Sequence, residues 1–131
     1  MSTYRGSSLA AYQSVAAHGG VAAADPHGLI TMLLDGALQR LAAARGAVEH
    51  GARESKGRLI HRVVEIIDEL RASLNFETGG EIAANMANLY DYSSRQLLRA
   101  NLENRIDLLD EVSHLLREIR SAWIQIPARK M

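Results

Sequence analysis

The sequence predicts an all-α protein, an antiparallel four-helix bundle with an additional short N-terminal cap helix. Apolar residues recur at alternating spacings of three and four through four long stretches, the pattern of helices that bury one face. Only short polar or glycine-containing links separate these stretches, and such links join antiparallel neighbours. Hydrophobic residues make up 47% of the 131 residues and there are only two prolines, so the protein can build a core.

We divide the sequence into an N-terminal segment, the bundle and a tail: residues 1–25, 26–127 and 128–131. The N-terminal segment is rich in Ser, Gly and Ala, and Leu9, Tyr12 and Val15 fall three apart on one side of a short helix. Such a short helix needs a surface to lie on. Two interpretations stay open, a frayed tail and a detachable cap over an apolar groove.

The first bundle helix is predicted to begin at Asp25-Pro26, because Asp is a good N-cap and Pro suits the first helical position. Gly36 lies beside the apolar seam, where it would let another backbone approach closely, and Gly51 is predicted to end the helix. The seam consists of Ile30, Leu34, Ala37, Leu41, Ala44 and Val48.

The second helix is predicted from about Glu54 to Asn75, and its apolar surface is wider than one seam. A helix with such a wide apolar surface either lies centrally in a bundle or covers a partner. The seam consists of Ile60, Val63, Ile67, Leu70 and Leu74, and the residues that widen it are Leu59, Val64 and Ile66.

A glycine corner is predicted between the second and third helices. Thr78 and Glu81 have the spacing of a capping box, and Gly79 and Gly80 can adopt left-handed dihedral angles. The third helix would run from Thr78 to about Leu102, again with a wide apolar surface. Its apolar residues are Ile82, Met86, Leu89, Tyr90, Leu97 and Leu98.

The fourth helix is predicted to begin at Asn104 as N-cap, with Asp107 near the positive end of the helix. Pro127 would stop it. Its seam consists of Leu109, Val112, Leu116, Ile119, Trp123 and Ile126.

The residue types argue against most catalytic and metal chemistry. There is no cysteine, which excludes disulfides, thiolate zinc sites and thiol nucleophiles. Glu111 with His114, and His61 with Glu65, have metal-ligand spacings but fall off the seams, so we expect them to face solvent. The sequence has no G-x-S-x-G, phosphate loop or G-x-G-x-x-G. We therefore expect no enzyme, no metal and no cofactor.

Charge and hydropathy limit the classes of partner that we expect for this protein. The 15 basic and 15 acidic residues give zero net charge, which argues against nucleic acid as a partner. No secretory signal or apolar run of about 20 residues is visible, so we expect a cytoplasmic protein without membrane insertion. One small arginine cluster is present, and acidic residues lie close enough to offset it. The arginines are Arg95, Arg99 and Arg105, and the acidic residues are Asp91, Glu103 and Asp107.

Tyr90 and Tyr92 stand out because aromatic residues are scarce. Two interpretations are equally open. In one, Tyr90 packs in the core with its hydroxyl at the rim. In the other, one of the two tyrosines borders a binding groove.

Three separated blocks of the sequence carry distinctive residues in a fixed order and spacing. They are Asp25, Pro26, His27, Leu29, Ile30, Met32, Leu33, Asp35, Gly36 and Ala37, then Gly79, Gly80, Glu81, Ile82, Ala83, Asn85, Leu89, Tyr90, Asp91 and Tyr92, then Ala100, Asn101, Leu109, Asp110, Glu111, Val112, Ile119, Arg120, Ala122 and Trp123. These blocks resemble the flagellin export chaperones of the FliS family. The likeness covers roughly residues 4–126, and Tyr12 matches the aromatic residue of that family's N-terminal segment, whereas the run from Val15 to Ala24 departs from it.

This resemblance implies a cytoplasmic bundle that holds newly made flagellin. It implies that the disordered C-terminal segment of flagellin wraps around the bundle and folds there. It also implies that premature filament assembly is prevented and that flagellin is delivered to the flagellar type III export gate.

The apolar residues of the two wide helices and the N-terminal segment are the predicted partner-binding residues. Some of them must fill the core, and the sequence does not sort the two groups. Two other classes stay open: a self-associating structural bundle that forms a homodimer, and a metal-binding bundle enzyme. The predicted partner-binding residues are Tyr12, Val63, Ile66, Leu70, Leu74, Ile82, Met86 and Leu89.

Overall fold

The computed structural model describes residues 25–126, and this part of the protein is built entirely of helices and their links. The predicted cap helix with Tyr12, and Pro127, lie outside the described residues. The four helices are α2 (Pro26–Glu49), α3 (Arg53–Ala72), α4 (Phe76–Glu103) and α5 (Ile106–Trp123).

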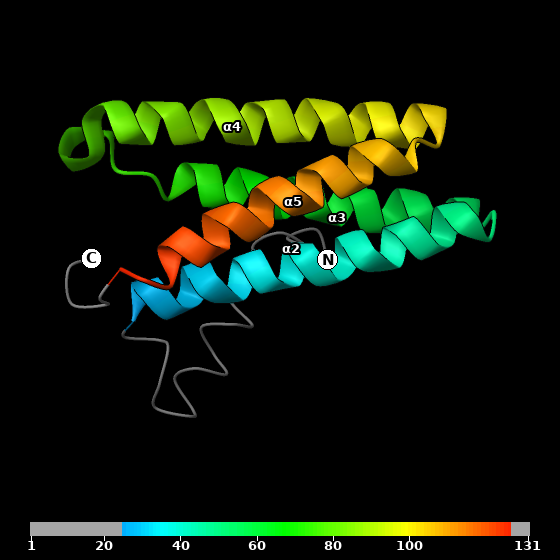
Figure 1. The fold of residues 1–131 in the computed structure, drawn as a ribbon, viewed down its shortest axis with the longest axis horizontal. Helices are drawn as coiled ribbons and strands as arrows, with labels where there is room; N and C mark the ends of the chain where they lie inside the picture. Colours follow the sequence, from blue (N-terminus) through cyan, green and yellow to red (C-terminus); the bar gives the residue numbers. More distant parts are fainter. Residues whose placement is uncertain (1–24, 127–131) are drawn as a thin grey trace, which may run out of the picture.

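Consecutive helices run in opposite directions along the long axis of the molecule (Figure 1). Helix α2 packs against α3 and α5, and α4 packs against the same two helices, with the most extensive contact between α2 and α3. The predicted antiparallel bundle of four helices is therefore confirmed for the described part of the protein.

The core lies where the four predicted seams meet. On α2, the seam residues Leu34, Ala37, Leu41 and Ala44 are fully buried, and Gly36 beside them is buried as well. Every helix contributes large side chains to the same cluster. Its largest fully buried members are Leu34, Leu41, Ile60, Ile66, Ile67, Leu70, Leu97, Leu109, Leu116, Val63 and Val112.

Helix α2 begins as predicted. The Oδ1 atom of Asp25 accepts a hydrogen bond from the backbone N–H of His27 at 3.0 Å, and Pro26 is the first helical residue. At the other end, α2 stops at Glu49, and Gly51 adopts a φ of 68° in the link that follows. A left-handed residue just after a helix is the usual way to reverse the backbone direction.

The prediction for the corner between α3 and α4 is wrong about the cap residue and right about the conformation of one of the two glycines. The cap of α4 is Asn75, whose Oδ1 accepts from the backbone N–H groups of Glu77 and Thr78 at 3.0 and 3.1 Å. Because Asn75 already satisfies these first amides, α4 starts at Phe76 and Thr78 lies inside its first turn. The capping box of Thr78 with Glu81 is therefore not the helix start.

Gly80 interrupts α4 one turn after it begins. Its dihedral angles are φ 52° and ψ −124°, which are non-helical and favour glycine, whereas Gly79 does not have a positive φ. The turn that contains Phe76 is thereby set at an angle to the long part of α4, at its left end in Figure 1.

The link between α4 and α5 also differs from its prediction. The sequence predicts that Asn104 caps the start of α5, but Asn104 ends α4 in the left-handed conformation, with φ 53° and ψ 45°. Asn tolerates this conformation better than most residues. Helix α5 instead begins after Arg105, which makes no side-chain cap hydrogen bond.

The end of α5 is tied to the start of α2. The rings of His27 and Trp123 stack with centroids 4.7 Å apart. The Trp123 indole donates a hydrogen bond to the His27 carbonyl at 3.0 Å, and His27 Nε2 lies 2.8 Å from the Trp123 carbonyl. One turn before Trp123 on α5, Arg120 forms an ion pair with Asp35 of α2. We call the His27 and Trp123 pair the terminal clamp.

Candidate partner-binding surface

The structure divides the predicted partner-binding residues into two groups. Val63, Ile66 and Leu70 on α3 are each at most 1% exposed and belong to the core. Helices α2 and α4, which pack against α3, leave these three side chains inside the bundle. The sequence leaves open whether these three residues fill the core or bind a partner, and the structure places their side chains in the core.

The other described residues of the prediction are accessible. Ile82 is 74% exposed and Leu89 is 37% exposed, while Leu74 and Met86 are half-buried and pack against the edge of the core. Phe76, which the sequence prediction left out, is 53% exposed just before the glycine break. We call Phe76, Ile82, Met86 and Leu89 the α4 apolar surface.

Helical spacing explains why this surface exists. Ile82, Met86 and Leu89 are at positions i, i+4 and i+7, so they form one stripe along the first half of α4. The face that α4 turns to the core at this end carries Ala83 and Ala87, which are small. Small core-facing residues leave the larger apolar side chains of this half on the flank of the helix.

The second half of α4 carries two further exposed leucines. Leu98 is 55% exposed and Leu102 is 84% exposed. They lie four residues apart, so they share one face, and successive rotations of 100° place that face well away from the stripe of Ile82 and Leu89. These two leucines therefore do not belong to the α4 apolar surface.

The two tyrosines have different environments. Tyr90 is buried, and this burial raises the pKa of its hydroxyl to about 12. Tyr92 is half-buried, and its hydroxyl donates to Glu111 Oε2 at 2.5 Å, a hydrogen bond that raises the pKa of Tyr92. The core interpretation therefore holds for Tyr90, and Tyr92 links α4 to α5.

Both carboxylates predicted to face solvent are engaged instead. Glu65 is half-buried and forms an ion pair with Arg62 at 3.1 Å. Glu111 is half-buried and accepts from Tyr92 and, at 3.2 Å, from Gln96 Nε2. The expectation was wrong because its off-seam position faces α4 rather than water. His61 and His114 are exposed, and each lies beside a glutamate one turn along its own helix. Among residues 25–126, no three His, Asp or Glu side chains are grouped so that they could hold a metal ion.

The arginine cluster is offset by acidic neighbours only in part, because Arg95 forms no ion pair among the described residues and Asp91 pairs with Arg71 of α3 at 3.2 Å. Arg105 forms ion pairs with Glu103 at 3.1 Å and Asp107 at 2.8 Å, and Arg99 pairs with Glu103 at 3.4 Å. Within the described part of the protein, none of the helices combines the length and hydropathy that crossing a lipid bilayer requires.

The described residues therefore form a helical bundle that presents an apolar flank of α4. The sequence matches the family model described as "Flagellar protein FliS" over residues 8–130. The protein belongs to the FliS family.

Curated relatives agree with this family. The sequence is 47% identical over 112 residues to "Flagellar secretion chaperone FliSB" of Pseudomonas aeruginosa, covering 86% of this protein and 89% of that relative. It is 45% identical over 124 residues to "Flagellar secretion chaperone FliS" of Salmonella typhimurium, covering 94% and 92%. A protein of the same name from Vibrio cholerae is 41% identical over 120 residues, covering 92% and 88%. These names support a role as a flagellar export chaperone.

Proposed function

We propose that this protein binds the disordered C-terminal segment of flagellin in the cytoplasm, prevents its premature polymerisation and delivers it to the flagellar type III export apparatus. It does so by binding alone, without catalysis. The family match and the names of the relatives support the chaperone role, and the α4 apolar surface supports the mode of binding.

The observation that carries the proposal is the exposed stripe on the first half of α4. An amphipathic helix binds such a surface through apolar residues at spacings of three and four, which match Ile82, Met86 and Leu89. Covering each of these side chains contributes roughly 1–2 kcal/mol before ordering costs are subtracted.

A disordered client fits a reversible chaperone. A segment that folds only on the bundle loses conformational entropy when it binds, so its affinity stays moderate for the area that it covers. Moderate affinity lets the client be released at the export apparatus. The same contacts hide apolar side chains of the client until then.

Calorimetry with a peptide of the flagellin C-terminus tests the proposal. We expect saturable binding with a negative heat-capacity change, which reports burial of apolar surface. The double variant Ile82→Ser with Leu89→Ser should weaken binding by roughly tenfold or more, because two apolar contacts are lost. Both positions are exposed, so circular dichroism should show an unchanged fold.

The matched control is Leu102→Ser, which removes an equally apolar and still more exposed side chain from the same helix. It should leave the affinity within about twofold of the unmodified protein. Equal losses in both variants would contradict placement of the client on the α4 apolar surface. Light scattering that shows a stable dimer with no peptide binding would favour the self-associating bundle instead.

A further inference from the structure

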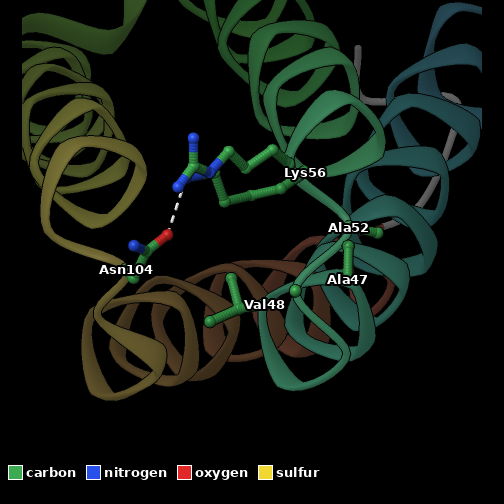
Figure 2. A pocket seen from close by; sticks show the side chains of 7 residues that line it. Ala47, Val48, Ala52, Lys56 and Asn104 are labelled. Atoms are coloured by element: carbon green, nitrogen blue, oxygen red, sulfur yellow. Dashed lines mark hydrogen bonds between the residues drawn. The ribbon is translucent and has the colours of Figure 1, made fainter.

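A pocket of about 260 Å³ lies at the end of the bundle opposite the terminal clamp, where the α2–α3 link meets the α4–α5 link (Figure 2). Its walls are partly methyl groups, from Ala47, Val48 and Ala52. Its charged lining residues are Arg53 and Lys56, both from the first turn of α3. The function proposed above uses none of these residues.

Lys56 is unusual because its side chain is charged and only 9% exposed. Its Nζ donates to the Asn101 carbonyl at 2.9 Å and to Asn104 Oδ1 at 2.6 Å, the second bond spanning the pocket in Figure 2. Both acceptors are neutral. An ammonium has three N–H donors, so the third one has no acceptor within residues 25–126.

The positive charge at this pocket is not balanced by the described carboxylates. A buried lysine is normally paired with an acidic group, because an uncompensated charge is costly away from water. Glu103, next to Asn104 in sequence, is already engaged by Arg99 and Arg105. Arg53 forms no ion pair within the described part of the protein either.

We infer that this pocket binds a carboxylate group of a peptide partner. The free N–H of Lys56 and the guanidinium of Arg53 supply donors for the two carboxylate oxygens, and such charge-assisted bonds are the strong ones. The methyl walls suit the short hydrocarbon stem of a carboxylate better than a phosphate, whose several oxygens each need a donor. The partner carboxylate belongs either to an acidic side chain or to the C-terminus of the peptide.

An NMR titration of the isolated full-length protein tests this inference independently of flagellin binding. Sodium acetate should shift the backbone amides of Arg53 and Asn104 in a saturable way, and phosphate at the same ionic strength should bind more weakly. Lys56→Met keeps the apolar stem and removes the donors, so it should weaken acetate binding by roughly tenfold or more. Absence of saturable shifts, or equal binding by Lys56→Met, would overturn the inference.

Two further variants guard against a folding effect of Lys56→Met. Arg53→Gln changes an exposed residue and should weaken acetate binding severalfold while circular dichroism stays unchanged. Arg95→Gln on α4 removes another arginine that makes no ion pair among the described residues, and it should have no effect. If Arg95→Gln weakens binding as much as Arg53→Gln, acetate is reporting general charge and the site is refuted.

Two peptides then distinguish the sources of the carboxylate. One carries a glutamate and an amidated C-terminus, and the other is an alanine peptide with a free C-terminus. Saturable shifts with the first assign an acidic side chain, and shifts with the second assign a free peptide terminus. Failure of both peptides at concentrations where acetate saturates would overturn a peptide partner.

Discussion

Helices α3 and α4 have similarly wide apolar surfaces in the sequence but opposite environments in the fold. Ile60, Ile66 and Ile67 on α3 are each at most 1% exposed, whereas Ile82 and Leu102 on α4 are mostly exposed. Both helices have two packing neighbours. Apolar width therefore indicates that a helix has surface to bury, but it does not say whether the same molecule or a partner buries it.

The difference follows from how each helix meets α2. Helix α3 lies along α2 in the most extensive helix contact of the bundle, whereas α4 has no comparable contact with α2. Figure 1 shows α4 along one side of the molecule, with α5 crossing from the end of α4 to the start of α2. Because α5 diverges from the first half of α4, it does not cover the stripe of Ile82 and Leu89.

The largest expected effect comes from one substitution made on both helices. Ile66→Ala should lower the free energy of unfolding by roughly 2–5 kcal/mol, because it opens a cavity in the core. Ile82→Ala should change it by no more than about 0.5 kcal/mol, because the side chain is exposed. Urea unfolding followed by circular dichroism measures both values. Similar losses at the two positions would mean that Ile82 is packed in the core as firmly as Ile66.

Tyr90 tests the buried face of α4. Burial raises its pKa to about 12, while an unfolded tyrosine titrates near its ordinary value of about 10. The neutral hydroxyl therefore adds stability that is complete below about pH 10 and is lost as the pH rises toward 12. Between about pH 10 and 12, the free energy of unfolding of the unmodified protein should therefore fall by roughly 2 kcal/mol more than that of Tyr90→Phe.

Urea unfolding at a series of alkaline pH values makes this comparison. The control is Tyr92→Phe, which changes a less buried tyrosine on the same helix and should show a smaller difference. An identical alkaline loss in the unmodified protein and Tyr90→Phe would show that Tyr90 is not held in an apolar environment.

The terminal clamp offers a smaller effect that is separate from α4. Trp123→Phe keeps an aromatic ring against His27 but removes the indole donor to its carbonyl. We expect a loss of about 1 kcal/mol in unfolding free energy, the usual size for one hydrogen bond. Binding of the flagellin peptide should be unchanged. A weakened affinity would mean that the client also contacts the end of α5.

The smallest expected effect concerns a surface ion pair on α4. Arg99 and Glu103 are about half exposed and 3.4 Å apart. Replacing Arg99 with alanine should change the free energy of unfolding by less than about 0.5 kcal/mol, since solvent screens such pairs. A thermal melt is sufficient to measure it. A large loss would show that the exposed side of α4 is more constrained than its surface suggests.

Periodicity was enough to predict the helices, their order and most of the core. The seams of α2 and α5 could be assigned because each has one clear apolar stripe. The exception is Ile126, which lies beyond the end of α5 at Trp123 and is 39% exposed. The caps of α4 and α5 were missed because Asn75 and Asn104 are each compatible with more than one cap. Choosing between Thr78 and Asn75 needs the backbone path, which depends on how α3 and α4 pack.

The predicted partner-binding residues differ in exposure in a way that the sequence does not reveal. Ile82 and Leu89 are accessible, whereas Ile66 is buried. The sequence cannot tell Ile66 apart from the other two because it is equally apolar and belongs to an equally wide helix surface. Phe76 was missed although a lone phenylalanine beside a glycine corner was a usable signal. Lys56 had no signal at all, because its burial arises only where two links meet.

Methyl NMR of the protein with the flagellin C-terminal peptide tests whether the client binds the α4 apolar surface. With labelled isoleucine, leucine and methionine methyl groups, we expect the signals of Ile82, Met86 and Leu89 to shift strongly on binding. Ile60, Ile66 and Ile67 should keep their positions, because they stay inside the bundle. Strong shifts of these three core residues, with unmoved signals of Ile82 and Leu89, would contradict binding of the client at the α4 apolar surface.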